Sequence, residues 1–346
     1  MIRYYLSVFS LICFVAAYGA ENSDTPETSG GAAAWKEYLP QIHGVLRPRF
    51  EMDTENGKGR FALRHARLSL GSDIGPFDYF FNTDFCDQGK VKILDYYAGV
   101  HATRNLYLRM GQYRMPFGTE PFLGPATSVF ANRSFIGKQI CNFRAVGLKA
   151  SWSFTAVPLS VEAGIFNPTP ITEHIVWTDR FAYSGKATLK PGDFSLSAGM
   201  MSVLPGGIRM NLADVSAGWS HGRWQIAGEY MYEHYTHSAY RDVHGWLAYA
   251  DYKFPVKAGI FNRMSVQLRY DGMTDHSSGQ PDSDGQLQTD HAARNRLTGG
   301  VTISYIRSRD VHVDVRVNYE KYFYRGTTSV SPGEGDKALL DMVVSF

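Results

Sequence analysis

Apolar and polar residues alternate one by one along most of the chain from Gln41 onward. In the run from Val311 to Glu320, every second residue is Val or Tyr, and the residues between them are polar or charged. The same period of two returns in runs that begin at Ile42, Phe77, Trp224, Met264 and Leu340. Because successive side chains of a strand point to opposite faces, this period predicts β-strands whose two faces meet different surroundings.

Two kinds of protein fit such alternation, and further features separate them. A soluble β-sandwich also has one apolar and one polar face on each strand. Here, however, the apolar face keeps large aromatic side chains throughout, and the chain contains 21 Tyr and 21 Phe. Outer-membrane barrels carry girdles of such residues where they meet the two lipid interfaces. The chain also stops on Phe346, an aromatic residue inside the last alternating run.

The segments between the alternating runs differ in length in a regular way. Tight turns are expected at 73–76, 102–105, 190–193, 221–223 and 307–310. Longer polar loops are expected at 116–144, 167–180, 234–243, 275–295 and 324–336. Segment 254–261 is longer than this scheme requires. We therefore predict an all-β protein, a transmembrane antiparallel β-barrel of about sixteen strands with short periplasmic turns and longer extracellular loops.

The beginning of the chain has the pattern of an export signal. Arg3 precedes an apolar run at 6–17, and small residues follow near Gly19. We expect a signal peptide at 1–20, a flexible periplasmic leader at 21–38 and the barrel at 39–346. The remainder has no second run of about 18 apolar residues, so no membrane-spanning helix is expected.

Composition narrows the chemistry further. The formal net charge of +2 argues against a nucleic-acid-binding protein. Cys86 and Cys141 remain after the signal peptide, and they could pair in an oxidising compartment. No Cys/His spacing suggests a metal site, and no cofactor is expected. The sequence lacks a Gly-x-Ser-x-Gly nucleophile motif, so no catalytic residue is assigned and an enzyme is not expected.

Several short motifs, taken in order, resemble one family. They are RHARL at 64–68, GPFDY at 75–79, LDYY at 94–97, GQYRMPFG at 111–118, NRS at 132–134, GIFN at 164–167 and GEY at 228–230. Together they resemble the phosphate-selective porin O and P family over most of the mature chain. The resemblance implies a water-filled barrel of sixteen strands, commonly a homotrimer, whose third loop folds inward and narrows the pore.

The same resemblance points to arginines as the selective groups. Arg67, Arg133 and Arg144 match family positions by motif, and Arg114 stands where the family often has lysine. The near-neutral net charge and the scarcity of lysine depart from a strongly anion-selective pore.

The residues themselves also suggest an anion-attracting pore wall. Guanidinium groups fork onto phosphate oxygens, and rings of arginine act as anion filters. The candidates that line the pore are Arg47, Arg49, Arg67, Arg109, Arg133 and Arg144. The alternative is that Glu51, Asp78, Asp84 and Asp95 neutralise them in a lumen network.

These features lead to one expected function and two alternatives. We expect a porin in the outer membrane of a Gram-negative bacterium, which lets small polar or anionic solutes diffuse passively, with phosphate as one candidate. It would contact outer-membrane lipid, and Phe346 would be an assembly signal for the barrel-assembly machinery. The alternatives are a lipase-like outer-membrane barrel enzyme and a secreted all-β carbohydrate-binding protein.

Overall fold

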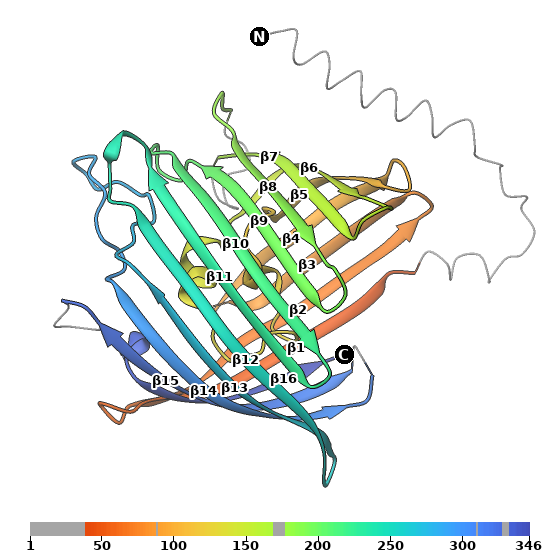
Figure 1. Cartoon of the computed structure of the whole chain (residues 1–346), viewed down its shortest axis with the longest axis vertical. Coiled ribbons are helices and arrows are strands. Elements are labelled where there is room, and N and C mark those ends of the chain that lie inside the picture. The colour runs from red at the N-terminus through yellow and green to blue at the C-terminus, as the bar shows by residue number, and fades with distance from the viewer. Residues whose placement is uncertain (1–38, 88, 169–176, 309–310, 327–331) are drawn as a thin grey trace, which may run out of the picture.

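The structure is a computed structural model that describes residues 39–346 except 88, 169–176, 309–310 and 327–331. The expected signal peptide and leader therefore lie outside the described residues. The described residues form sixteen strands in one closed antiparallel barrel, in which each strand pairs with the next and β1 pairs with β16 (Figure 1). The predicted fold class is confirmed.

The strands are long and follow one another in chain order. Their bounds are β1 Gln41–Asp53, β2 Gly59–Ile74, β3 Phe77–Asp87, β4 Lys90–His101, β5 Leu106–Arg114, β6 Arg144–Ser153, β7 Leu159–Phe166, β8 Ala182–Leu189, β9 Phe194–Val203, β10 Met210–His221, β11 Trp224–Tyr235, β12 Val243–Ala258, β13 Phe261–Met273, β14 Arg294–Ile306, β15 His312–Tyr324 and β16 Lys337–Ser345. Short helical turns lie in the connections, at η3 Glu120–Phe122, η4 Ile136–Ile140, η5 Thr236–Ser238 and η6 Pro332–Glu334. None of the helices described here is long and apolar enough to cross a membrane.

The burial pattern is the reverse of that of a soluble protein. In β13, Leu268 is 55% exposed, whereas its neighbours Arg269 and Asp271 are 1% and 0% exposed. Apolar side chains therefore cover the outside of the barrel, and charged ones fill its inside. A soluble sandwich would bury the apolar face instead, so this arrangement contradicts the secreted-sandwich alternative and fits a barrel surrounded by lipid.

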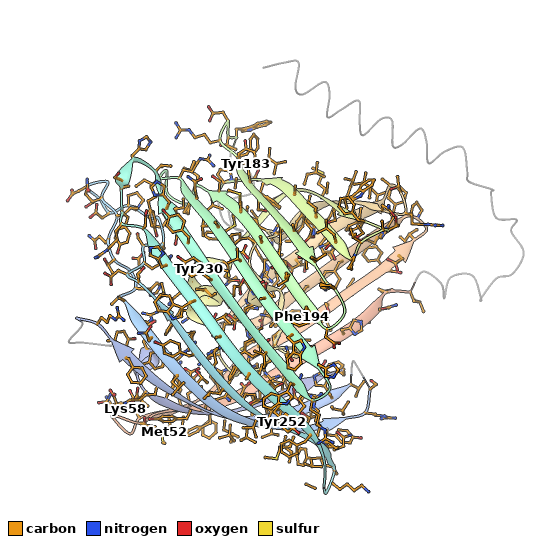
Figure 2. The ribbon with its side chains drawn as sticks, viewed as in Figure 1. Met52, Lys58, Tyr183, Phe194, Tyr230 and Tyr252 are labelled. Carbon is orange, nitrogen blue, oxygen red and sulfur yellow. The ribbon has the colours of Figure 1, made fainter. Side chains whose placement is uncertain are left out.

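Aromatic residues stand at both ends of the outer face (Figure 2). Tyr183 is the second residue of β8, after a long connection, and Phe194 is the first residue of β9, after a tight turn. Tyr230 and Tyr252 also carry their side chains on the outside of β11 and β12. Two such belts match the aromatic girdles expected from the composition.

The connections follow the predicted alternation with exceptions. The end of the barrel that carries the odd-numbered connections is called the loop end, and the other end is called the turn end. Long connections at the loop end include 115–143 and 274–293, but those at 54–58 and 204–209 are short. At the turn end, segment 254–261 is mostly strand, because β12 continues to Ala258 through a register shift after Pro255. Proline has no N–H to donate, which accounts for the irregular pairing there.

The third connection at the loop end, residues 115–143, folds into the barrel and is called the constriction loop. Figure 1 shows its yellow coils inside the ring of strands. Its buried side chains form the apolar core with inward-facing residues of β5 to β13. The inward-folded third loop that the resemblance implied is therefore present.

Candidate functional site

The first anchor of the constriction loop lies on the wall of β8 to β11. Asp214 of β10 accepts a hydrogen bond from the Gly118 N–H at 3.3 Å. Glu229 of β11 accepts one from the Thr119 N–H at 2.6 Å. Lys186 of β8 donates to the Gly118 carbonyl oxygen. Inward-facing charges of the strands thus hold the loop backbone in place.

The second anchor holds residues 131–135 on the wall of β13 to β15. Arg269 donates to the Asn132 carbonyl oxygen at 2.8 Å, and Arg296 donates to that of Arg133 at 2.7 Å. Asp271 accepts from the Phe135 N–H at 2.9 Å. Each of these bonds joins a charged group to the backbone, and such bonds are stronger than neutral ones.

Arg47 and Arg49 of β1 complete this second anchor. Both donate to the Ala131 carbonyl oxygen, and both pair with the buried carboxylate of Asp341 in β16. Their guanidinium groups border the lumen, as expected, but they donate to the loop, to Asp341 and, from Arg49, to Glu51. The structure therefore brings them to the constriction as positioning residues.

Apolar packing fixes the segment that follows. Ile136 and Ile140 are fully buried, and Gly245 of β12 leaves the space that their side chains fill. Burying a side chain of this size contributes about 1.5–3 kcal/mol. The loop is therefore a packed part of the barrel wall, held at two anchors and along this apolar stretch.

A large basic cavity of about 640 Å³ lies between the constriction loop and the wall of β1, β2 and β14 to β16. Among the described residues, thirteen arginines and lysines line it, whereas Glu51 and Glu334 are the only carboxylates that do. The cations are Arg47, Arg49, Arg60, Arg64, Arg67, Lys92, Arg114, Arg133, Lys138, Arg144, Arg294, Arg296 and Lys337. Cations therefore dominate the surface of the cavity, and most of them pair with carboxylates that lie on or behind its wall.

A β-bulge in β2 adds to this charge. Arg47 pairs with His65 and Pro48 pairs with Leu63, so Arg64 has no partner residue across the strand pair. Pro48 cannot donate a ladder hydrogen bond, and a bulge re-aims the side chains around it. As a result, the adjacent residues Arg64 and His65 both line the basic cavity.

A second, smaller cavity of about 250 Å³ lies beyond it, lined by Tyr97, Lys149 and the loop residues Pro121 to Gly124. Four residues line both cavities, and all four are arginines. They are Arg67 of β2, Arg114 of β5, Arg133 of the constriction loop and Arg144 of β6. They are called the arginine constriction, because a solute that moves between the two cavities passes them.

Two of the four charges are balanced by adjacent carboxylates. Arg67 pairs with Asp84 at 2.9 Å. Arg144 pairs with Asp95 at 3.0 Å. The lumen network that was the alternative to an anion-attracting wall therefore exists for this half of the constriction.

Among the described residues, neither of the other two arginines forms an ion pair with a carboxylate. Arg133 donates to the carbonyl oxygens of Pro121 and Leu123, at 3.1 and 2.8 Å. The Nε atom of Arg114 is buried without a hydrogen-bond partner within the described part of the chain. Burial lowers the pKa of Arg133, the carboxylate of Glu120 opposes this in part, and the positive charge of Arg67 lowers it further. A passing anion would offer the partner that these groups lack.

Arg109 lies in the smaller cavity and not in the constriction itself. Its guanidinium stacks on the Tyr97 ring, 3.8 Å from the ring centroid, and donates to the Tyr107 hydroxyl at 3.2 Å. All six arginines expected at the pore thus line one cavity or both. That they attract anions stays a prediction.

Arg114 is the site residue that sequence reasoning left out of the candidate set. It is the last residue of β5, where the chain leaves the strand and enters the lumen. The period of two therefore does not predict the direction of its side chain. The one feature that indicated a pore-lining role for Arg114 was the resemblance, because that family often has lysine at this position.

Cys86 and Cys141 are both free thiols, so the possible disulfide is not formed. Cys86 lies at the end of β3, and its Sγ contacts the Leu63 carbonyl oxygen at 3.2 Å. The Cys141 Sγ lies beside Gly118 and Met231 of β11. In a ring of sixteen strands β3 and β11 are eight strands apart, on opposite sides of the lumen. Burial raises the pKa of Cys141 well above its ordinary value, which keeps the thiol protonated.

No metal centre is evident in the part of the chain that the structure describes. Groups of three or more His, Cys, Asp or Glu residues placed to hold an ion do not occur there.

Comparison with solved structures places the fold among outer-membrane porins. The chain is similar to an anion-selective porin from Comamonas acidovorans, with a TM-score of 0.60 and 12% identity over 89% of this chain and 99% of the other. It is similar to OprB of Pseudomonas putida, with a TM-score of 0.63 and 10% identity over 90% and 96% of the two chains. The outer membrane channel DcaP of Acinetobacter baumannii gives 0.59 and 14%, over 89% and 97%. No family model matches the chain, and no curated protein matches it in sequence.

Proposed function

We propose that this chain is an outer-membrane porin, a water-filled channel through which small polar solutes diffuse, with a modest preference for anions. The observation that carries the proposal is the arginine constriction, where Arg114 and Arg133 form no ion pair with any carboxylate in the described part of the chain. Unbalanced positive charge in a narrow aqueous passage raises the local concentration of anions, and salt weakens the effect.

Phosphate is the anion that this geometry suits best. Arginine presents a planar fork of donors that matches phosphate oxygens, and it stays charged at every relevant pH. The paired arginines and the near-neutral net charge of +2 limit the preference. We therefore propose anion preference with phosphate as a favoured solute, and not exclusion of all other ions.

We also propose that the chain lies in the outer membrane and forms a homotrimer. The apolar outer face would contact lipid, and β16 closes on β1 with Phe346 and Gly44 exchanging backbone hydrogen bonds of 2.7 and 3.1 Å. We propose Phe346 as the residue that the barrel-assembly machinery reads. Native mass spectrometry of the detergent-extracted protein tests the trimer, and a monomer alone would contradict it.

Reversal potentials in a planar bilayer test the channel proposal. A salt gradient across single channels should give a potential of anion sign at low salt, which shrinks as salt rises. Added phosphate should lower the chloride current if it occupies the constriction. A cation-selective channel would contradict the anion preference, and a folded barrel without conductance would leave the barrel enzyme as the better alternative.

A further inference from the structure

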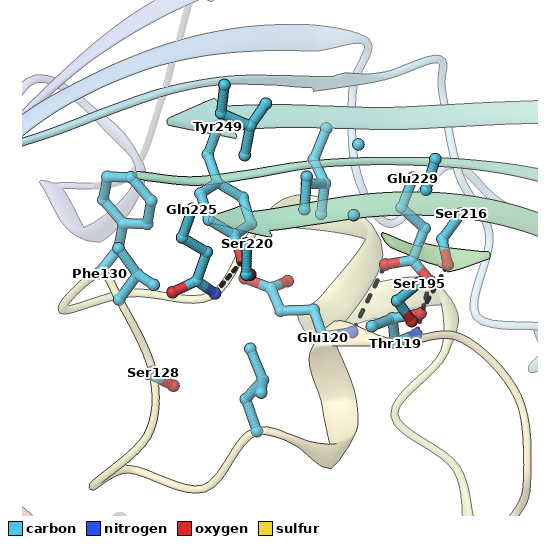
Figure 3. Close-up of a pocket in the computed structure, with 18 of the residues that line it drawn as sticks. Thr119, Glu120, Ser128, Phe130, Ser195, Ser216, Ser220, Gln225, Glu229 and Tyr249 are labelled. Atoms are coloured by element: carbon cyan, nitrogen blue, oxygen red, sulfur yellow. Dashed lines mark hydrogen bonds between the residues drawn. The ribbon is translucent and has the colours of Figure 1, made fainter. Parts of the chain in front are cut away.

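A third cavity, called the side pocket, lies between the constriction loop and β9 to β12 (Figure 3). The basic cavity lies between the same loop and β1, β2 and β14 to β16, across the ring of strands. The side pocket has a volume of about 200 Å³, and it is enclosed between residues 119–130 of the loop and the inner wall of β9 to β12. Ser128 and Phe130 line both this pocket and the basic cavity. A thin stretch of loop therefore separates two compartments of the lumen.

The lining of the side pocket differs sharply from that of the basic cavity. Within the described residues, no arginine or lysine lines it. Its floor consists of small residues of β9 and β10, among them Ser195, Ser216, Gly218 and Ser220. The Ser216 hydroxyl bonds to those of Thr119 and Ser197, at 2.9 and 2.7 Å. An anion would find hydroxyl groups there but no positive charge.

The carboxylates around the pocket are already engaged. Glu229 accepts the backbone N–H groups of Thr119 and Glu120, at 2.6 and 3.4 Å. Glu120 accepts the Ser134 N–H at 3.0 Å and faces Arg269 at 3.5 Å. Asp193, the third carboxylate of the lining, bonds to the His221 Nδ1 at 2.6 Å. A buried cation would therefore compete with donors that hold the loop in place, which makes a positively charged ligand a poor fit.

Two aromatic rings form the remaining wall. Phe130 and Tyr249 meet edge to face, with ring centroids 5.9 Å apart, and the Gln225 amide donates to the Tyr249 hydroxyl at 3.0 Å. Figure 3 shows these three side chains together at one end of the pocket. A ligand pocket commonly combines apolar and aromatic walls with a few placed polar groups. Aromatic faces suit the C–H faces of a sugar ring, and hydroxyl and amide groups suit its hydroxyls.

We propose that the side pocket binds a neutral polyhydroxylated molecule of about the size of one sugar ring. Its hydroxyls would bond to the serines of β9 and β10 and to the Gln225 amide, and its ring would lie against Tyr249. This site is separate from the arginine constriction and does not depend on the anion preference proposed above. The pocket reaches Asp193 and Ser220, so a solute enters it from the turn end.

Saturation-transfer NMR on the folded, detergent-solubilised protein tests this, with D-glucose as the probe. Choline and gluconate, the cationic and anionic probes, are measured in parallel. We expect saturation of the glucose ring protons, unaffected by an excess of phosphate, and several-fold weaker saturation of choline and gluconate. No transfer to glucose, or stronger transfer to choline, would overturn the proposal.

Variants locate the binding. A Cβ at Gly218 would meet its nearest atoms at ordinary distances of 3.8 to 3.9 Å, so Gly218→Leu fills the pocket without a backbone clash. Gly299→Leu is the matched control, because a Cβ there meets nothing within 4 Å and its neighbour Thr298 is the inward-facing, buried residue of β14. Glucose transfer should fall at least fivefold in Gly218→Leu and in Tyr249→Leu and persist in the control. Equal glucose transfer in a folded pocket variant and in the control would refute the site. Loss of the anion preference would contradict the role of the arginine constriction and not the side pocket.

Discussion

Arg114 offers the sharpest test of the constriction, because its removal takes away a charge that forms no ion pair with a carboxylate among the described residues. Its side chain lines both cavities, and its Nε atom has no hydrogen-bond partner in the described structure. Arg114→Gln keeps the length and polarity of the side chain and removes the positive charge. We expect the anion-to-cation permeability ratio to fall in this variant.

The size of the effect follows from Coulomb's law. A unit charge about 5 Å from a passing ion in a water-filled passage contributes roughly 0.8 kcal/mol. Screening at 0.1 M salt, where the Debye length is about 10 Å, reduces this to roughly 0.5 kcal/mol. That value changes the local anion and cation concentrations by about twofold each, in opposite directions, so the ratio falls roughly fivefold. At 1 M salt the Debye length is about 3 Å, and the change should be less than about twofold.

Reversal potentials at the two salt concentrations measure this permeability ratio. Two control variants show whether a change in the ratio is specific to Arg114. Arg144→Gln with Asp95→Asn removes a neutral pair from the same constriction, so the ratio should stay within about twofold of the native channel. Arg241→Gln removes an exposed arginine of the loop end, paired with Asp275 at 3.0 Å, and should change it little. An unchanged ratio in Arg114→Gln, or an equal fall in Arg241→Gln, would refute the assignment of selectivity to the constriction.

Three further outcomes can be measured. Asp341→Asn should lower the free energy of unfolding by about 3–5 kcal/mol, because it leaves the buried Arg47 and Arg49 without their shared carboxylate. Urea titration in detergent measures this loss, and a loss under about 1 kcal/mol would contradict the prediction. Deleting Phe346 should lower the amount of heat-modifiable barrel in the outer membrane, and normal amounts would count against its role in assembly. Burial lowers the pKa of His291 from 6.5 to about 4. Loop 274–293 should therefore lose stability and become easier to proteolyse as the pH falls from about 6.5 toward 4, and His291→Gln should remove that pH dependence.

The fold could be predicted from the sequence because one physical rule repeats in every strand. Each strand separates lipid from water, so the period of two persists from β1 to β16, and the exposed Leu268 beside the buried Arg269 is its direct result. Segment 254–261 was not predicted as strand. Pro255 interrupts the ladder there, and a bulge restores pairing near Ala258, which alternation alone does not reveal.

The roles of single arginines were less predictable. Alternation placed Arg47 and Arg49 on the inner face correctly. Their partner, the carbonyl oxygen of Ala131, belongs to a loop 84 and 82 residues away in the chain. Nothing in the local pattern of β1 indicates that this loop returns to it. The possible pairing of Cys86 with Cys141 was wrong for a related reason. Cys86 lies at the end of β3, whereas the inward fold of the constriction loop carries Cys141 to the side of β11, across the lumen.

The net charge of +2 understates how strongly the lumen is polarised. The constriction loop divides the interior, with thirteen described cations lining the basic cavity on one face and none lining the side pocket on the other. Carboxylates such as Asp214 and Glu229 face the loop from the second side, where they bind its backbone. The net charge of the chain adds the charges on both faces of the loop, whereas a permeating ion responds only to charges within about one Debye length. The loop therefore creates a local field that composition cannot report, because it separates a compartment whose wall carries cations from one that no described cation lines.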